Sequence, residues 1–313
     1  MRERKVPDAD DRRLRVAKLH RNERPRRDAE RLALARRARV IVAPMTSPLA
    51  APGPWDLVAP AYSAELVPQF ELYSREALRL AGLRPSSRIV DVATGPGTLA
   101  VLAARAGHTV AALDFAPSMV AALRARVDAE GLGSKIDARE GDGMALPYAD
   151  ASFHGGFSMF GLMFFPDRDK GFRELLRVVK PGAAVVVSSW LPLDRVEFLH
   201  AAITALMELV PPPPNAPPYD PPLTTREKCL SEMKQAGVRD VEVHEVTFEM
   251  PVMSTTEAWA VMERTTAPIV LRKKHLGERW NDVSKGVLER LLAKFGDAPR
   301  TSAMPAFLTV GRR

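Results

Sequence analysis

The chain of 313 residues is poor in cysteine, since Cys229 is its only one. A lone cysteine excludes a disulfide within the chain and a zinc site built from cysteines. Long apolar runs are also missing: the longest, such as residues 183–187, are strand-sized and far from the ~18 residues of a membrane span. The amino end lacks the apolar stretch of a secretory signal peptide. We therefore expect a protein of a reducing cytoplasm, without a membrane span.

Acidic residues are outnumbered only near the amino end. Residues 1–44 hold 15 Lys or Arg against 7 Asp or Glu, a net charge of +8. Because the whole chain carries +7, the other 269 residues carry −1. The basic character therefore does not belong to the globular part, and it is weak evidence for nucleic-acid binding.

We assign residues 1–50 to a basic arm, disordered or loosely helical, because it has too few large apolar residues to hold a fold. Two other interpretations stay open. The arm is an extension that binds nucleic acid, or the start site is placed too early, since Met45 opens the stretch that leads into the globular part. Residues 51–313 are expected to form one domain. Its segment 211–222 contains eight prolines and is predicted to be stiff, extended and part of a cover.

Apolar strands alternate with amphipathic helices through this domain. The expected strands are 88–93, 109–114, 136–140, 153–159, 183–189, 241–249 and 306–310, and the expected helices are 66–81, 98–106, 117–130, 169–179, 195–210 and 225–236. Near-continuous apolar strands between helices indicate a doubly wound α/β fold with a mostly parallel sheet covered on both faces. Such sheets bind ligands at the carboxyl ends of their strands, where the strand order reverses.

Three polar loops follow the first three strands. The first, Asp91-Val-Ala-Thr-Gly-Pro-Gly-Thr, joins a strand to a helix, and its glycines let a ligand lie against the main chain beside free helix N–H groups. A dinucleotide enzyme has a similar turn, and Ala100 does not exclude one. Asp114 ends the second strand, where a carboxylate can accept both ribose hydroxyls or simply cap a turn. Asp142, in Gly-Asp-Gly-Met, can accept a hydrogen bond from an adenine amino group.

These loops, together with Phe-Gly-Leu-Met-Phe-Phe-Pro-Asp at 160–167 and Arg-Val-Val-Lys-Pro-Gly at 177–182, resemble the class I S-adenosylmethionine-dependent methyltransferases. They are most similar to the branch around the ubiquinone/menaquinone-biosynthesis C-methyltransferases. The likeness covers about residues 55–313 and is densest from 88 to 190. Five segments in the right order are specific for fold and cofactor, but not for substrate. The resemblance implies a Rossmann-like, seven-stranded sheet with its last strand antiparallel, and S-adenosylmethionine as cofactor.

The resemblance also implies which residues contact the cofactor. Asp91 and two glycines would surround its methionine part, and Asp114 would hold the ribose. Ser158 with Met159 would lie near the sulfonium, and Tyr62 would close over the cofactor. The full implied set is Asp91, Gly95, Gly97, Asp114, Phe115, Asp142, Gly143, Met144, Ser158 and Tyr62. The chain departs from the family at His154, where an Asp is usual. We interpret His154 as structural, because it begins its strand and is expected to lie away from the pocket.

We predict transfer of a methyl group from S-adenosylmethionine to an O, C or N atom of a small molecule by in-line displacement, with the cofactor supplying the reactivity. The catalytic base, if one is needed, is unknown. Weak candidates are Asp194, His200 and Tyr219, all in the segment expected to cover the pocket. Phe160 or Met163 are candidates to line a pocket for an apolar substrate, and Trp190 is a candidate to face it.

Other functions stay open. One is a nucleic-acid methyltransferase that uses the basic arm, although we do not expect nucleic acid as the partner. Another is a protein that binds the cofactor without catalysis. No metal site is expected, since His108, His244 and His275 lack the spacing of metal ligands. The oligomeric state cannot be read from the sequence.

Overall fold

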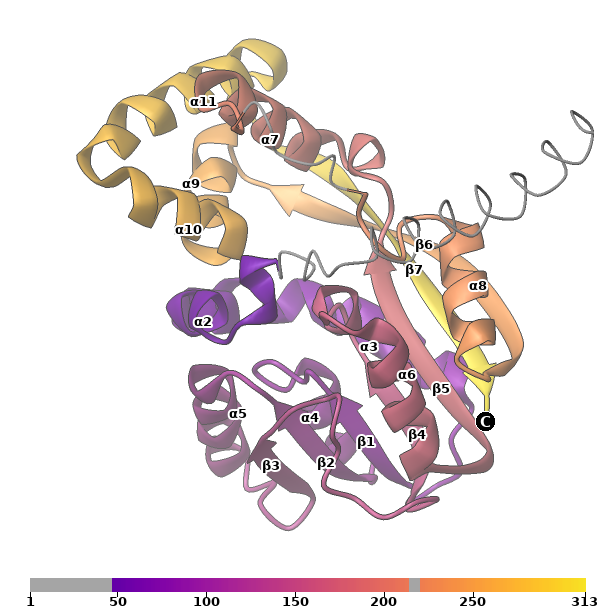
Figure 1. Ribbon diagram of the computed structural model, residues 1–313. Coiled ribbons are helices and arrows are strands. Elements are labelled where there is room, and N and C mark those ends of the chain that lie inside the picture. The colour runs from indigo at the N-terminus through magenta and orange to yellow at the C-terminus, as the bar shows by residue number, and fades with distance from the viewer. Residues whose placement is uncertain (1–46, 214–219) are drawn as a thin grey trace, which may run out of the picture. The chain divides into compact units, whose positions relative to one another are not determined.

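The computed structural model describes residues 47–213 and 220–313 (Figure 1). Residues 47–313 belong to one compact unit. The predicted basic arm lies outside the described residues except for its last four, 47–50. Residues 214–219 of the proline-rich segment also lie outside them, so the predicted covering role of that segment stays untested.

The described strands form one seven-stranded sheet in the order β3-β2-β1-β4-β5-β7-β6. Their bounds are β1 Arg88–Val92, β2 Thr109–Asp114, β3 Ile136–Glu140, β4 Phe153–Ser158, β5 Val179–Trp190, β6 Arg239–Val252 and β7 Arg300–Arg312. Strands β1 to β5 are parallel, and β7 runs antiparallel between β5 and β6. The predicted fold is confirmed. The strand order reverses between β1 and β4, which is where such sheets bind ligands.

Helices cover both faces of the sheet. One face carries α3 (Val67–Ala81), α4 (Thr98–Arg105) and α5 (Pro117–Ala129), and the other carries α6 (Arg168–Val178) and α8 (Arg226–Gln235). The alternation within β1 shows why. Ile89 packs into the core beside α3 to α5, whereas Val90 and Val92 pack into the core beside α6, because successive strand residues point to opposite faces. Cys229 of α8 is buried in this second core, as expected.

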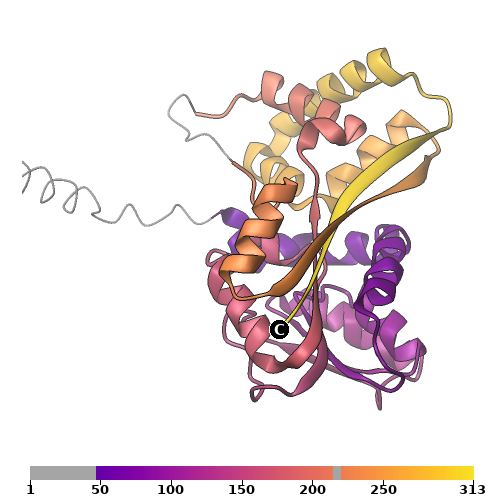
Figure 2. The same ribbon diagram turned by 90° about the vertical axis from the view of Figure 1, so that its right-hand side faces the viewer.

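A further group of helices is inserted after the sheet's fifth strand. Helix α7 (Glu197–Leu209) follows β5, while α9 (Thr255–Thr265), α10 (Ala267–Leu276) and α11 (Trp280–Phe295) lie between β6 and β7 (Figures 1 and 2). They share a core in which Trp259 and Trp280 stack with ring centroids 6.2 Å apart. Helix α2 (Gly53–Glu65) packs against α5 on one side and against α9 and α10 on the other.

Strands β5, β6 and β7 and helix α2 differ from the sequence-based expectation, β5 by extending from Val179 to Trp190. Strands β6 and β7 are longer than predicted because they pair with each other from Arg239–Arg312 to Val252–Arg300. Helix α2 was not expected, since its sequence holds three prolines close together. Pro52 and Pro54 lie at the helix start, where a missing N–H costs little, while Pro60 lies inside the helix with its side chain exposed.

Candidate functional site

The loops that follow β1 to β4 surround one hollow of about 990 Å³, part of which is open to solvent. We call it the central cavity. It lies at the carboxyl ends of the strands on both sides of the point where the strand order reverses. Its remaining walls come from α2, α3, the short helix η1 (Pro48–Ala50) and the segment around η2 (Leu162–Phe164). The three polar loops of the sequence therefore meet at one place.

Asp91 lies in β1 with its carboxyl group buried beside the cavity. Its Oδ2 accepts a hydrogen bond of 2.6 Å from the Thr94 hydroxyl, whereas Oδ1 is buried and has no hydrogen-bond partner among the described residues. Burial raises the pKa of Asp91 to about 7, against the lowering effect of the Thr94 hydrogen bond. A buried oxygen without a partner is costly unless a ligand supplies a donor.

The two glycines of the first loop have different structural roles. Gly95 lines the cavity, and its N–H donates a 2.8 Å hydrogen bond to Asp114 Oδ2. Gly97 is not among the cavity-lining residues. It precedes α4 with a φ of +76°, and a Cβ there would lie 2.1 Å from Leu123 Cδ1 of α5. Gly97 therefore allows α4 and α5 to pack closely.

Asp114 ends β2, and its side chain is almost fully buried at the cavity wall. Besides the bond from Gly95, its Oδ1 accepts a 2.9 Å hydrogen bond from the N–H of Ala116. Burial raises the pKa of Asp114 to about 6, and the charge of Asp56 contributes in the same direction. The pKa of the Tyr62 hydroxyl is raised, mainly by burial and to a smaller extent by the negative charge of Asp114.

The loop after β3 forms the part of the cavity wall beside Asp114. Gly141 donates its N–H to the Asp114 carbonyl oxygen at 2.9 Å. Asp142 is exposed, and its Oδ1 accepts a 2.8 Å hydrogen bond from the N–H of Met144. At Gly143 a Cβ would lie 2.5 Å from Phe165 Cζ, so a larger residue does not fit there. Asp114 and Asp142 thus line the same cavity, together with Phe115 and Met144.

Aromatic rings form another part of the cavity wall. Tyr62 of α2 stacks on Phe70 of α3 with centroids 5.5 Å apart, and Phe70 meets the edge of Phe160 at 5.1 Å. Phe160 in turn stacks on Trp190 at 4.2 Å. Phe160 lines the cavity and Trp190 lies behind it, outside the lining. Trp55 packs edge-on against Phe164 at 5.0 Å.

Trp55 and Phe70 were not singled out in the sequence. Trp55 and Tyr62 are seven residues apart, so they share a face of α2 once that helix is recognised. Because of its prolines this segment was not predicted to be a helix, so the shared face of Trp55 and Tyr62 was not recognised.

Several predicted residues lie elsewhere. Ser158 is fully buried at the end of β4, with no hydrogen-bond partner for its Oγ among the described residues, and the cavity is lined instead by its neighbour Met159. Met163 is in the core. Asp194 and His200 are exposed and outside the lining, so neither candidate base is placed at the cavity. Tyr219 lies outside the described residues.

His154 lies near the amino end of β4, away from the cavity. Its Nδ1 accepts a 3.1 Å hydrogen bond from the Arg88 N–H, and its Nε2 is 2.8 Å from Lys180 Nζ. These contacts are those of a structural residue. Within residues 47–213 and 220–313, no three His, Cys, Asp or Glu side chains gather in a way that would hold a metal ion, and no helix is long and apolar enough to cross a membrane.

Known proteins resemble this chain in the segment that builds the cavity. A family model described as a methyltransferase domain matches residues 90–187. A demethylmenaquinone methyltransferase of Thermus thermophilus is 36% identical over 149 residues, which are 43% of this chain and 67% of the relative. An uncharacterized protein of Mycobacterium tuberculosis is 29% identical over 215 residues, 68% of this chain and 76% of the relative. The crystal structure of the YcgJ protein of Bacillus subtilis matches with a TM-score of 0.53 at 16% identity, over 77% of this chain and 98% of YcgJ.

The fold and the matched domain define the class of protein. The chain belongs to the class I S-adenosylmethionine-dependent methyltransferases. Its methyl donor is S-adenosylmethionine.

Proposed function

We propose that the central cavity holds S-adenosylmethionine at the three polar loops and a small, neutral, largely apolar methyl acceptor against the aromatic wall. The observation that carries this proposal is one cavity lined on one side by Asp91, Asp114 and Asp142 and on the other by aromatic rings.

The polar side fits the cofactor group by group. The unpartnered Oδ1 of Asp91 is suited to the α-ammonium of the methionine part. Asp114 ends β2, where its carboxylate has lone pairs left to accept from the ribose hydroxyls. Asp142 is placed to accept from the adenine amino group, with Met144 and Phe115 beside the ring. Gly97 lies outside the lining and supports the site by allowing α4 and α5 to pack closely.

The aromatic side suits a neutral acceptor. No Lys, Arg or His is among the described residues that line the cavity, so an anionic acceptor would meet no opposite charge. Flat apolar molecules pack well on rings such as Phe70 and Phe160. The relative from Thermus thermophilus is named for a substrate of this kind, demethylmenaquinone.

The bound cofactor supplies an electrophilic methyl group, and the protein aligns the acceptor with it and excludes water. An ordinary tyrosine is protonated at neutral pH, and burial raises the pKa of Tyr62 further, so its hydroxyl can donate a hydrogen bond but does not act as a base. The acids of the site lie where the cofactor binds. The acceptor atom is therefore one that needs no strong base, such as an amine, an acidic hydroxyl or an activated carbon.

Two measurements test this function. Calorimetric titration should show binding of S-adenosylmethionine, and Asp114→Asn should weaken it about tenfold or more, as expected for losing a charge-assisted pair of hydrogen bonds. Absence of binding at millimolar cofactor would contradict the cofactor site.

The second measurement uses cofactor with a labelled methyl group and a metabolite extract. With the unaltered protein, we expect the label in the fraction that an organic solvent extracts. With the Asp114→Asn protein, we expect no label in that fraction. Label confined to anionic metabolites or to macromolecules would contradict the neutral acceptor.

A further inference from the structure

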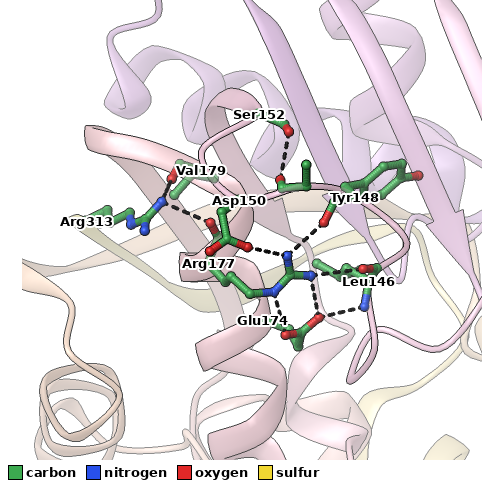
Figure 3. Close-up of polar contacts among 9 residues, drawn as sticks. Leu146, Tyr148, Asp150, Ser152, Glu174, Arg177, Val179 and Arg313 are labelled. Atoms are coloured by element: carbon green, nitrogen blue, oxygen red, sulfur yellow. Dashed lines mark hydrogen bonds and ion pairs between the residues drawn. The ribbon is translucent and has the colours of Figure 1, made fainter.

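Arg177, in the last turn of α6, has an acceptor for every N–H of its guanidinium group (Figure 3). Nε donates to Glu174 Oε1 at 2.8 Å, Nη1 to the Tyr148 carbonyl oxygen at 2.8 Å and to Asp150 at 2.7 Å, and Nη2 to the Leu146 carbonyl oxygen at 3.0 Å and to Glu174 Oε2 at 2.8 Å. All five donors are used. Three of the five acceptor atoms belong to Leu146, Tyr148 and Asp150 of the loop after β3, and the other two belong to Glu174, whose side chain itself binds that loop.

Glu174 completes the hold on one loop residue. Its Oε2 accepts a 2.8 Å hydrogen bond from the N–H of Leu146, whose carbonyl oxygen is bound by Arg177. The Leu146 side chain is buried in the same core as α6. The main chain of Leu146 is therefore fixed to α6 by both its donor and its acceptor.

The other end of this loop is fixed at the ribose site, where Gly141 donates to the Asp114 carbonyl oxygen. Between Gly141 and Leu146, the hydrogen bonds are those that Asp142 makes within the loop, to the N–H groups of Met144 and Ala145. The distance of Asp142 and Met144 from Asp114 thus depends on the two anchors. Neither Arg177 nor Glu174 lines the cavity.

We propose that Arg177 and Glu174 are positioning residues that hold the loop after β3 in the shape that recognises the adenine base of the cofactor. This inference rests on the proposed function, in which Asp142 and Met144 contact the adenine. Lysine cannot replace Arg177, because an ammonium group has three donors and cannot serve the five acceptor atoms of two carboxylates and two carbonyl oxygens.

Helix α6 offers a matched control. Arg168 pairs with Glu232 at 2.8 Å, with side chains 32% and 23% exposed, close to the 31% and 20% of Arg177 and Glu174. The Arg168 pair joins α6 to α8 and touches no residue of the loop. Arg168→Lys therefore removes a similar two-point guanidinium–carboxylate contact from the same helix, while keeping the charge and leaving the hydrogen bonds of the loop in place.

The test compares two probes, S-adenosylhomocysteine and its inosine analogue, in which a carbonyl replaces the adenine amino group. We expect the full-length protein to prefer the adenine probe in calorimetry. Arg177→Lys should reduce that preference about fivefold, as for one lost hydrogen bond, while Arg168→Lys should keep it. Hydrogen exchange of amides 142–146 should speed up in Arg177→Lys only.

Each outcome decides something different. Equal preference in Arg177→Lys, Arg168→Lys and the unaltered protein would overturn the positioning role. If the unaltered protein binds neither probe, the proposed cofactor site fails instead. Should Arg177→Lys not fold, Glu174→Gln is the second variant. Its amide oxygen can still accept from Leu146 while the ion pair is lost, and it should lose part of the preference.

Discussion

Two buried acids at the cavity make cofactor binding sensitive to pH. The pKa of Asp91 is raised to about 7 and that of Asp114 to about 6, in both cases mainly by burial. In the proposed site the carboxylate forms would accept hydrogen bonds from the cofactor, so we expect protonation to weaken binding. We predict that the affinity for S-adenosylhomocysteine falls as the pH is lowered from 8 to 5.5, measured by calorimetry. Asp114→Asn should bind weakly and show a shallower pH dependence, whereas a flat profile in the unaltered protein would contradict the assignment.

The same two acids affect the ligand-free protein in the opposite direction. Their pKa values are higher in the folded protein than the ordinary 3.8, so the folded state holds more protons between about pH 4 and 7. The stability they contribute is present below pH 4 and is lost as the pH rises through 6 and 7. We predict that Asp91→Asn gains stability relative to the unaltered protein as the pH rises over this range. Urea unfolding at several pH values measures it, and a difference independent of pH would be the contrary result.

We predict that the two glycines of the first loop, Gly97 and Gly95, differ in how much they contribute to the stability of the fold. Gly97→Ala places a Cβ 2.1 Å from Leu123 Cδ1 at a φ of +76°. We expect a loss of about 2–4 kcal/mol in the free energy of unfolding, from left-handed backbone strain and overpacking together. Gly95→Ala meets nothing within 4 Å at a φ of +56°, so only the backbone strain of about 1–2 kcal/mol applies. Denaturant unfolding should rank the two variants in this order.

At the scale of elements, the sequence predicted the parts whose signals are local. The largely apolar strands β1, β2, β4 and β5 and the glycine turn after β1 are recognisable because each is set by a short run of residues. The lengths of β6 and β7 were underestimated, since the residues at their ends, such as Arg239, Pro251 and Pro305, give no apolar strand signal. The aromatic wall could not be predicted as a whole, because Tyr62, Phe70 and Phe160 come from separate elements and meet only in the fold.

Helix α5 depends on another helix for its amino-terminal cap. Its own cap residue, Ala116, has no side-chain acceptor, and Asp56 of α2 accepts the Ser118 N–H at 2.8 Å instead. We predict that Asp56→Ala costs about 1 kcal/mol in thermal or urea unfolding, the usual value of a lost cap.

Asp56→Asn is the matched control, because its amide oxygen still accepts from Ser118 but carries no charge. It should keep most of the stability. Both variants should lower the pH at which cofactor binding is half lost, because the charge of Asp56 contributes to raising the pKa of Asp114. If this pH is unchanged in both variants, the charge of Asp56 does not affect the pKa of Asp114.

At the scale of the whole molecule, the site is assembled from parts far apart in the sequence. The polar loops of the cavity come from residues 91–144, whereas the aromatic wall comes from α2, α3 and Phe160. Helices α9 and α10, from near the carboxyl end, pack against α2. The family match at residues 90–187 covers the polar loops and Phe160 but leaves out α2 and α3, which supply the rest of the aromatic wall. This division explains why the motifs predict the methyl donor and not the acceptor.

Deleting residues 1–46 tests whether the basic arm takes part in the reaction. The compact unit starts at Ser47, and η1 after it already lines the cavity with Leu49 and Ala50. We predict that the protein of residues 47–313 binds S-adenosylhomocysteine within twofold of the full chain and labels the same small-molecule fraction. A nucleic-acid methyltransferase would instead depend on the arm for phosphate contacts, with binding that falls steeply as salt is raised. Only the arm carries the excess positive charge. If the full chain labels RNA or DNA and the protein of residues 47–313 does not, the methyl acceptor is therefore a nucleic acid and not a small molecule.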